Sequence, residues 1–299
     1  MKINVTYLDS IDLKLGDIVE ITGVLDTPSS NTVFNLYNYR LYLMSNKIYH
    51  TLKANSIKKI SSNKNIFYSV KNYIYERIDT LNSKAYLKTF ILGDKSSVSD
   101  NMKTIYQENG ISHLLAISGM HITLFSNLLD KIFAKFKKKH LIISLFLIFY
   151  AFLTNFTSSV IRAVVLYIFK DKDSKKTIIF LASILLIYNP YYIYNTGFVF
   201  SFTISFYLIL FSYKINKYNN YLVQLFITSI ISFFASIPIL INNFNSINIM
   251  TPIINLIFVP FISFIIFPLS IIVVIIPKLD FILVIFVKIL EFLSQHIKE

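Results

Sequence analysis

Cysteine and tryptophan are absent from this chain of 299 residues, and acidic residues are scarce, with 16 Asp and Glu against 29 Lys and Arg. The lack of cysteine excludes disulfide bonds and cysteine-ligated zinc. The shortage of acidic residues gives a net charge of +13. In a soluble protein that charge would indicate nucleic acid, but in a membrane protein Lys and Arg mark cytoplasmic loops and contacts with anionic lipid. The charge alone therefore does not decide whether the chain binds DNA.

Charged residues of both signs make up only 15% of the chain, whereas hydrophobic residues make up 55% and the mean hydropathy is +0.59. This balance is typical of a chain that folds in lipid. Apolar residues dominate residues 141–297, while residues 1–109 mix polar and apolar types. The pattern predicts a mainly α-helical, polytopic transmembrane bundle with short and broken helices, preceded by a small β-barrel domain, with the boundary near Gly110.

Residues 1–62 show the alternation of β-strands. Residues 17–25 and 39–44, the latter leading into residues 48–52, predict strands, and residues 26–31 have the composition of a turn. The length suits a barrel of the OB type, although a small sandwich fits the pattern as well. Aromatic and cationic side chains in this part are candidates for binding single-stranded DNA, the alternative being a barrel core with solvated Lys. They are Tyr37, Tyr39, Arg40, Tyr42 and Lys47.

Residues 63–109 predict connector helices. Apolar residues recur at helical spacing over residues 65–81, opposite Lys71, Glu76 and Asp79, which predicts an amphipathic helix that either lies on the membrane surface or serves as a plain connector. A second helix over residues 85–92 should end at Gly93, and Ser99 should cap a third helix that reaches about residue 108.

Eight apolar segments in residues 110–299 are candidates for membrane spans. They are residues 112–129, 141–154, 160–169, 177–188, 197–213, 221–241, 252–276 and 281–297. Segments 141–154 and 160–169 are the shortest, so they are candidates for half-helices that line a cavity. The proline residues of the later segments should kink or interrupt their helices. They are Pro238, Pro252, Pro260 and Pro268.

Basic and uncharged connections alternate between these segments. Lys residues follow residues 129, 169, 213 and 276, whereas residues 154–159, 189–196 and 242–251 carry no charge. The positive-inside rule then places the basic connections in the cytoplasm and residues 1–109, with the OB-like domain, on the outer side of the membrane. Export of such a domain requires a preceding signal or membrane helix. We therefore expect an upstream helix beyond this sequence, the alternative being an N-terminal domain that stays inside.

Two neighbouring segments are distinctive enough to indicate a family. Ile-Leu-Gly-Asp-Lys at residues 91–95 is followed by Gly-Ile-Ser-His-Leu-Leu-Ala-Ile-Ser-Gly-Met-His-Ile at residues 110–122. These segments resemble the signature of the ComEC family of bacterial competence proteins, the inner-membrane channels for transforming DNA. Later segments are similar to that family in the same order. The positions that carry the similarity include Gly93, Asp94, Gly110, Arg162, Gly197, Ser201, Asn255 and Pro260.

The resemblance implies a multi-pass channel in the bacterial inner membrane that takes up single-stranded DNA during natural transformation, with no enzymatic activity and no cofactor. The implied partners are single-stranded DNA, the lipid bilayer and the DNA receptor and motor proteins of the competence machinery, with homo-oligomerisation left open. Many members also carry a metallo-β-lactamase-like domain. We expect no such metal site here, because no cluster of His and Asp follows residue 281. The alternatives are a transporter of another anionic substrate and a membrane-bound hydrolase.

Polar residues within the apolar segments are the candidates for lining the channel, because a path for DNA must be wet and must offer donors to phosphates. They are His113, Ser118, Gly119, His121 and Arg162. On one helix His113 and His121 would lie about 80° apart around the axis, so both could face one cavity. The alternatives are hydrogen bonds that lock neighbouring helices, a metal pair without carboxylates, a nucleophile pair of Ser118 and His121, and, for Arg162, a structurally paired cation.

Overall fold

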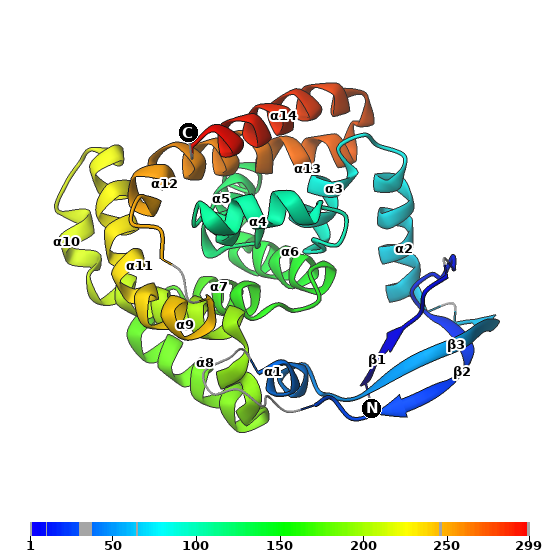
Figure 1. The fold of residues 1–299 in the computed structure, drawn as a ribbon. Helices are drawn as coiled ribbons and strands as arrows, with labels where there is room; N and C mark the ends of the chain where they lie inside the picture. The colour runs from blue at the N-terminus through cyan, green and yellow to red at the C-terminus, as the bar shows by residue number, and fades with distance from the viewer. Residues whose placement is uncertain (1, 10, 30–37, 64, 245–246, 298–299) are drawn as a thin grey trace.

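The computed structural model describes residues 2–9, 11–29, 38–63, 65–244 and 247–297. Most of the chain is helical, and a three-stranded sheet near the N-terminus stands beside the helical part (Figure 1). The strands are β1 (Lys2–Thr6), β2 (Asp17–Asp26) and β3 (Ile48–Ser62). The α-helices are α1 (Tyr39–Ser45), α2 (Ile66–Asp79), α3 (Lys84–Leu87), α4 (Asp100–Glu108), α5 (Gly119–Ile132), α6 (Lys139–Leu153), α7 (Ser158–Ile168), α8 (Ser174–Tyr188), α9 (Thr196–Leu210), α10 (Ser212–Asn216), α11 (Tyr221–Phe244), α12 (Thr251–Pro260), α13 (Phe267–Ile275) and α14 (Asp280–His296).

Five shorter turns of other helix types complete the described elements. Two are π-helical, η1 (Lys88–Leu92) and η4 (Phe261–Ile266), and three are 3₁₀-helical, η2 (Ser112–Leu115), η3 (Pro190–Tyr194) and η5 (Pro277–Leu279). π-Helical turns inside helices are rare and occur often at functional sites. Both of them contact the region around α5 described below.

The strands form an open sheet in the order β1-β3-β2, with β1 parallel and β2 antiparallel to β3. Strand β2 confirms the prediction at residues 17–25, and β3 contains the strand predicted at residues 48–52 but continues to Ser62. Apolar side chains on the sheet stay exposed, with Val24 at 63% and Ile60 at 64%, so the described strands enclose no barrel core. The β-barrel of the OB type is therefore not confirmed.

Residues 39–44 form helix α1, so the prediction of a strand there is wrong. The side chain of Asn38 caps the helix by accepting a hydrogen bond from the backbone N–H of Leu41 at 3.1 Å. At the other end, the side chain of Asn189 donates to the carbonyl of Ser45 at 2.9 Å. The cap and this contact with a residue far along the chain both favour the helix. The alternation of polar and apolar residues, on which the strand prediction rested, reveals neither of them.

The connector helices predicted for residues 65–108 are confirmed. Helix α2 begins after Asn65, whose side chain caps it. Helix α3 continues as the π-helix η1 and ends at Gly93, which has a φ of 72°. Ser99 caps α4 by accepting a hydrogen bond from the backbone N–H of Met102 at 3.3 Å. Capping chemistry was sufficient to predict the end at Gly93 and the start after Ser99, whereas apolar spacing predicted α2.

Within the described residues, two helical stretches are long and apolar enough to cross a membrane, namely α11 and the continuous run from Thr251 to Ile275 that comprises α12, η4 and α13. Helices α6, α7 and α9 are apolar but shorter. These features suggest membrane association, whereas a polytopic bundle is not confirmed. Pro260 stands directly before η4, so the interruption expected there is a change of helix type within a continuous run.

Residues 112–129 are not one helix. They comprise η2, an extended stretch at residues 116–118 and the first part of α5. Ala116 has φ −86° and ψ 140°, and Ser118 has φ −104° and ψ 169°, which is extended backbone. The prediction that His113 and His121 share one helix is therefore wrong, and so is the angle between them that rested on it. Residues 197–213 are likewise divided between α9 and α10.

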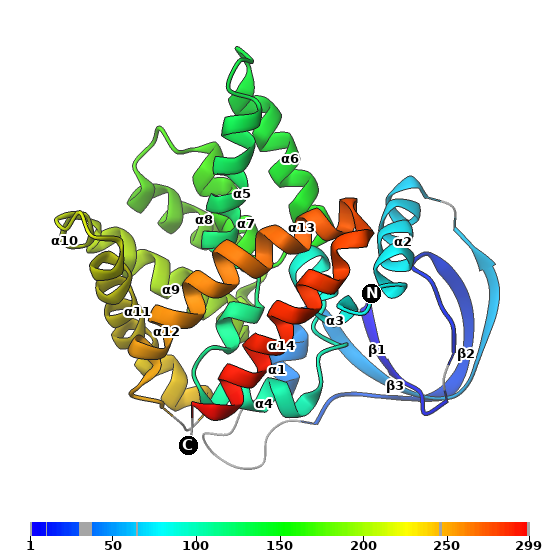
Figure 2. The same ribbon diagram turned by 90° about the horizontal axis from the view of Figure 1, so that it is seen from above.

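The last helix folds back beside α13 and is tied to the start of α3 (Figure 2). The buried carboxylate of Asp280 accepts hydrogen bonds from the backbone N–H of Asn82 at 2.8 Å and from the hydroxyl of Ser83. In addition, Arg77 of α2 donates to the carbonyls of Val274 at 2.7 Å and Ile275 at 3.0 Å at the end of α13. The connector helices are thereby fixed to the C-terminal helices.

Asp280→Ala should destabilise the fold, because it leaves buried donors on residues 82 and 83 without an acceptor. We expect a loss of about 2–3 kcal/mol in the free energy of unfolding, measured by circular dichroism in detergent. Asp100→Ala is the control, since the side chain of Asp100 is 97% exposed and pairs only with Lys103 one turn away. It should cost less than about 1 kcal/mol. Equal losses in the two variants would contradict the role given to Asp280.

The sheet should lose stability only in strongly acidic solution. The ammonium group of Lys59, the backbone N–H of Lys14 and the hydroxyl of Ser62 lower the pKa of Asp17 from 3.8 to about 2. A carboxyl whose pKa is lowered by folding stabilises the fold above its unfolded value, and this contribution is lost as the pH falls through about 2. Hydrogen exchange of β2, corrected for its intrinsic pH dependence, should accelerate only in that range. Asp17→Asn should abolish this acid-dependent step, and an unchanged profile would refute it.

Candidate functional site

Gly93 turns the chain sharply at the end of η1. Its φ of 72° lies in the left-handed region that favours glycine, and a Cβ there would lie in ordinary contact, at 3.6 Å, with Cβ of Thr154. The carboxylate of the next residue, Asp94, accepts hydrogen bonds from the backbone N–H of Ser96 at 2.9 Å and from the hydroxyl of Tyr75 at 3.4 Å. Asp94 therefore holds the loop that follows the turn.

Gly110 brings the loop before η2 against the first residue of α12. It has a φ of 71°, and a Cβ would lie 2.1 Å from Oγ1 of Thr251. The carbonyl of Gly110 accepts a hydrogen bond from Nδ1 of His113 at 2.9 Å, which leaves Nε2 of the neutral ring as an acceptor. The side chain of His113 is open to solvent although protein surrounds it, and the charge of Lys95 acts on it. His113 therefore lies in a wet recess beside a cation.

Ser118 and His121 form a capping box at the start of α5. Nδ1 of His121 accepts a hydrogen bond from the backbone N–H of Ser118 at 3.1 Å, and the side chain of Ser118 accepts one from the backbone N–H of His121. The ring of His121 is fully buried. Its centre lies 4.5 Å from the centre of the Phe267 ring and 5.7 Å from that of the Phe90 ring. Its Nε2 has no hydrogen-bond partner in the described part of the chain. His121 thus lies in dry surroundings, apart from the accessible His113.

Arg162 carries a buried positive charge in the middle of α7, with 8% of the residue exposed. Its Nη1 donates to the carbonyl of Ser201 and to the hydroxyl of Ser205, both on α9. The ion pairs found among the described residues do not include Arg162, and its Nε has no partner there. Nη2 points to the start of α5, because a Cβ on Gly119 would lie only 2.7 Å from it.

The remaining positions of the family resemblance lie on α9 and α12. Gly197 is in the first turn of α9, where a Cβ would lie 3.2 Å from Oδ1 of Asn195, the residue that caps this helix. Pro260 ends α12. Oγ of Ser201 and Oδ1 of Asn255 are buried and have no partner among the described residues. Gly197 and Pro260 therefore shape their helices, while Ser201 and Asn255 leave polar atoms inside the bundle.

The N-terminal residues predicted to contact DNA lie on α1 or just after it. The rings of Tyr39 and Tyr42 stack with their centres 6.4 Å apart, and Arg40 is exposed. Lys47 is engaged elsewhere, because its Nζ lies 3.5 Å from the centre of the Tyr188 ring on α8. Tyr37 lies outside the described residues. Tyr39 and Arg40 are thus the members of this set that clearly remain open to solvent.

Lys71 is a functional candidate that the sequence did not reveal. The helical pattern puts it on the polar face of α2, yet it is buried, and its Nζ donates to Oδ1 of Asn155 at 2.6 Å and lies 4.4 Å from the centre of the Phe152 ring. Burial lowers the pKa values of the Lys71 and Lys95 ammonium groups. The bonded partners are 84 residues apart, so no local signal could find this contact.

The hydrolytic and metal-binding alternatives find little geometric support. In a hydrolase of the serine type a third group orients the histidine through its second nitrogen, but Nε2 of His121 has no partner among the described residues. The described ranges also contain no group of three or more His, Cys, Asp or Glu that could hold a metal ion.

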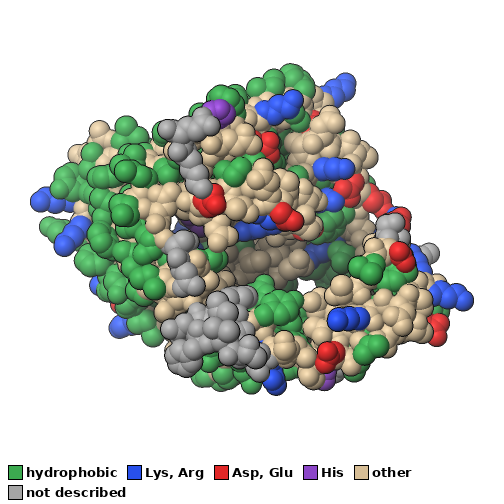
Figure 3. Space-filling model, viewed as in Figure 1, with side chains coloured by type: hydrophobic (Ala, Val, Ile, Leu, Met, Phe, Trp, Pro, Cys, Tyr) green, Lys and Arg blue, Asp and Glu red, His purple; other side chains and the backbone are tan. Residues whose placement is uncertain are grey.

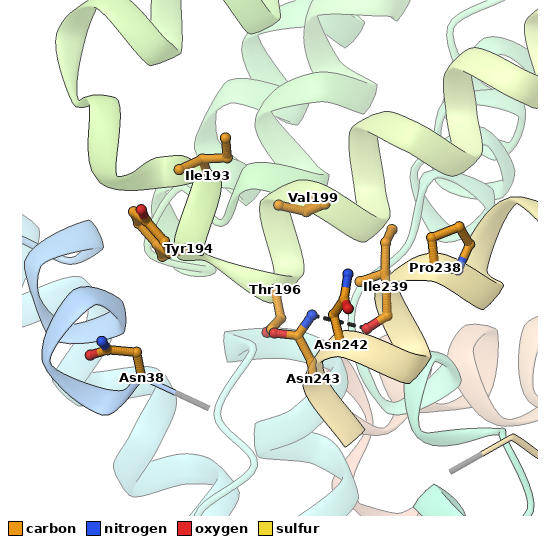
Figure 4. Close-up of a pocket in the computed structure, with 9 residues that line it drawn as sticks. All are labelled: Asn38, Ile193, Tyr194, Thr196, Val199, Pro238, Ile239, Asn242 and Asn243. Atoms are coloured by element: carbon orange, nitrogen blue, oxygen red, sulfur yellow. Dashed lines mark hydrogen bonds between the residues drawn. The ribbon is translucent and has the colours of Figure 1, made fainter. Parts of the chain in front are cut away.

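A pocket of about 340 Å³ opens between the start of α1, η3, α9 and the end of α11 (Figure 4). Its lining consists of Asn38, Ile193, Tyr194, Thr196, Val199, Pro238, Ile239, Asn242 and Asn243. None of these side chains is charged at neutral pH, and none was among the predicted site residues. The pocket therefore offers hydrogen bonds but no charge to an anionic ligand.

Comparison with known proteins assigns the family. Residues 90–298 match the family described as Competence protein. The chain belongs to the competence protein family. It is also 33% identical over 267 residues to ComE operon protein 3 of Bacillus subtilis (strain 168), and this match covers 83% of the chain and 34% of that protein. The chain thus spans about a third of the length of this curated relative. No solved structure matches the chain.

The competence protein match begins at Phe90, within η1, and so covers the Gly93 turn, the broken segment around residue 116 and Arg162. The sheet, α1 and α2 precede the matched region. The predicted membership of the ComEC family is confirmed. The residues gathered around η1, α5 and α7 accordingly belong to the part of the chain that defines the family.

Gly110→Ala should destabilise the protein, because alanine adopts a positive φ at a cost and its Cβ would clash with Thr251. The expected loss is about 1–3 kcal/mol in the free energy of unfolding. Combining Gly110→Ala with Thr251→Ala should recover part of the loss, because the second change removes the clashing oxygen and methyl group. Thr251→Ala alone, which adds no Cβ at residue 110, is the control. Thermal unfolding in detergent measures all four proteins, and a Gly110→Ala variant as stable as the control would contradict the argument.

Proposed function

We propose that this chain forms the membrane part of a passage for single-stranded DNA in natural transformation. Membership of the competence protein family and the similarity to ComE operon protein 3 support a role in competence and DNA uptake. The residues themselves supply the argument for a passage that carries a polyanion.

The observation that carries the proposal is a set of central cations without carboxylate partners. Lys71 donates to an amide oxygen and Arg162 to a carbonyl and a hydroxyl, and Lys95 forms no ion pair among the described residues. Figure 3 shows a hollow in this face of the molecule with Lys and Arg side chains in its depth, in the region that α1, α2, α4 and α7 surround in Figure 1. Buried or half-buried cations that lack counter-ions attract an anion.

A passage must also release the strand it attracts. Donors that each contact a single phosphate, and do not surround it with several paired hydrogen bonds, bind weakly enough for the anion to enter and to leave. His113, open to solvent beside Lys95, adds an uncharged acceptor at the same place. The extended backbone at residues 116–118 separates this wet side from the dry packing around His121, and broken backbone at membrane depth is tolerated where it lines a cavity.

The arrangement of the basic turns supports a membrane orientation. The turn between α5 and α6 and the turn between α7 and α8 both carry several Lys residues. Figure 2 shows these two turns projecting to the same side of the molecule, with α1 towards the other side. If this side faces the cytoplasm, α1 lies towards the outer side of the bacterial inner membrane, where an incoming strand would first meet Tyr39 and Arg40.

Single-stranded DNA is favoured over the alternatives for a physical reason in each case. A transporter of a small anion would need a closed, charged pocket, and the pocket described beside α9 does not supply one, because its lining is uncharged. A hydrolase would need an orienting group on His121, which is missing among the described residues. A long polyanion, in contrast, fits cations distributed over several elements.

Uptake of labelled DNA by a host that lacks its own copy of the gene tests the proposal. The wild-type chain should restore uptake, and Lys71→Met combined with Lys95→Met should lower it severalfold. The purified double variant should also bind oligothymidylate more weakly. The slope of the logarithm of its binding constant against the logarithm of the salt concentration should be reduced by about 0.7 for each lost cation. Lys175→Met combined with Lys176→Met removes the same charge from an exposed turn and should behave as wild type in both measurements.

Each alternative gives a different result in the same experiment. Normal DNA uptake without the gene would refute the passage. Equal losses in the two double variants would show that net charge alone matters. If a hydrolytic activity were found and Ser118→Ala and His121→Ala both abolished it, the hydrolase would replace the passage as the function.

A further inference from the structure

We propose that Arg162 and the first turn of α5 form a binding site for a single phosphate group, and that its ligand is a backbone phosphodiester of the passing strand. The second half of this statement rests on the proposed function, whereas the site itself rests on geometry alone. The site does not depend on Lys71 and Lys95, because these residues lie on other elements.

The guanidinium group of Arg162 is held in one orientation with part of it left free. Both of its hydrogen bonds leave from Nη1 and end on α9, at the carbonyl of Ser201 and the hydroxyl of Ser205. Nε has no partner in the described part of the chain, although more than nine-tenths of the residue is buried. A guanidinium group donates five hydrogen bonds and recognises phosphate through two parallel ones. The edge formed by Nε and Nη2 therefore keeps hydrogen-bond donors that the described residues do not use.

Gly119 brings this free edge to the start of α5. A Cβ on Gly119 would lie 2.7 Å from Nη2, closer than a side chain tolerates, so the guanidinium group occupies the space that glycine leaves empty. Helix α5 runs from Gly119 to Ile132, long enough for a helix dipole. A positive side chain at the positive end of a helix is unfavourable by itself, and an anion that contacts both the guanidinium group and the first N–H groups of α5 would offset the conflict.

The first turn of α5 has N–H groups to offer to that anion. The capping box uses the backbone N–H of Ser118, which donates to the His121 ring, and that of His121, which donates to the Ser118 side chain. The N–H groups of Gly119 and Met120 take no part in it. Because the first N–H groups of a helix have no partner within the helix, these two are donors at the same end as the guanidinium edge. Two N–H groups and one guanidinium edge match the oxygens of a phosphate.

A strand inside the bundle suits this site better than a lipid headgroup. Arg162 lies in the middle of α7, which contacts α5, α6, α8 and α9, and only a small part of it is exposed. A headgroup would have to leave the membrane surface to reach it, whereas a phosphodiester carries one negative charge for each nucleotide along an extended strand. A half-helix N-terminus aimed at an anionic group inside a transporter bundle is also a known way to bind substrates.

The site is tested first without DNA, on the purified full-length chain in detergent. Inorganic phosphate should raise the midpoint of thermal unfolding relative to chloride at equal ionic strength. Arg162→Met should abolish this shift, and Gly119→Ala should reduce it, because the new Cβ displaces the guanidinium group while alanine favours the helix. Lys170→Met, which removes an exposed cation just after the end of α7, should keep the full shift. A wild-type chain without a phosphate-dependent shift, or a Gly119→Ala variant with the full shift, would overturn the site.

The ligand is tested with oligothymidylate and with its uncharged methylphosphonate analogue. The wild-type chain should prefer the charged strand, and the variants at residues 119 and 162 should show a smaller preference, with the slope of log K against log salt concentration reduced by about 0.7. If phosphatidylglycerol in the micelle abolishes the phosphate-dependent shift while oligothymidylate leaves it unchanged, the ligand is a lipid headgroup and the DNA assignment is wrong. A phosphate-dependent shift in a protein that neither binds nor takes up DNA would keep the site and remove the proposed function.

Discussion

A buried guanidinium group that no carboxylate of the described residues neutralises is the constraint on which the central packing depends. An isolated charge inside a protein or a membrane costs several kcal/mol unless oxygens replace its water. Two oxygens of α9 bind Nη1 of Arg162, which fixes α9 against α7, and glycine at residue 119 allows α5 to approach the other edge. The positions of three helices thus follow from the need to solvate one side chain. The partial solvation also explains why the remaining edge is open to a ligand.

The break before α5 divides the region into a dry side and a wet side. On the dry side, the π-helices η1 and η4 bring Phe90 and the adjacent Phe267 against the ring of His121, and these rings leave no access for water. On the wet side, His113 faces solvent beside Lys95. The capping box of Ser118 and His121, at the start of α5, is the boundary between the wet side and the dry side. A continuous helix through residues 112–129 would instead have placed both histidines in the same surroundings.

Local chemistry predicted some of these features, and distant contacts decided the rest. Gly93 and Ser99 mark helix ends through their own conformation or caps, so the sequence was sufficient for them. The alternation at residues 39–44 indicated a strand, but a cap and an asparagine about 145 residues away favoured α1. The family signature pointed to Arg162 and Gly119, but it could not show that the guanidinium group lies against Gly119. Lys71 looked like a solvated residue because its partner, Asn155, is distant in sequence.

The part of the chain that precedes the family match shares the hydrophobic core of the matched part through Ile78 and Leu87, and polar contacts also join the two parts. Lys71 and Arg77 bind α2 to the loop after α6 and to the end of α13, and Asn189 binds α1 to η3. Elements from both parts therefore surround the hollow of Figure 3, and neither part encloses it alone. Because these contacts use backbone carbonyls and amides, charges near the hollow remain uncompensated. A carboxylate placed beside each of these cations would neutralise the charge that attracts a polyanion.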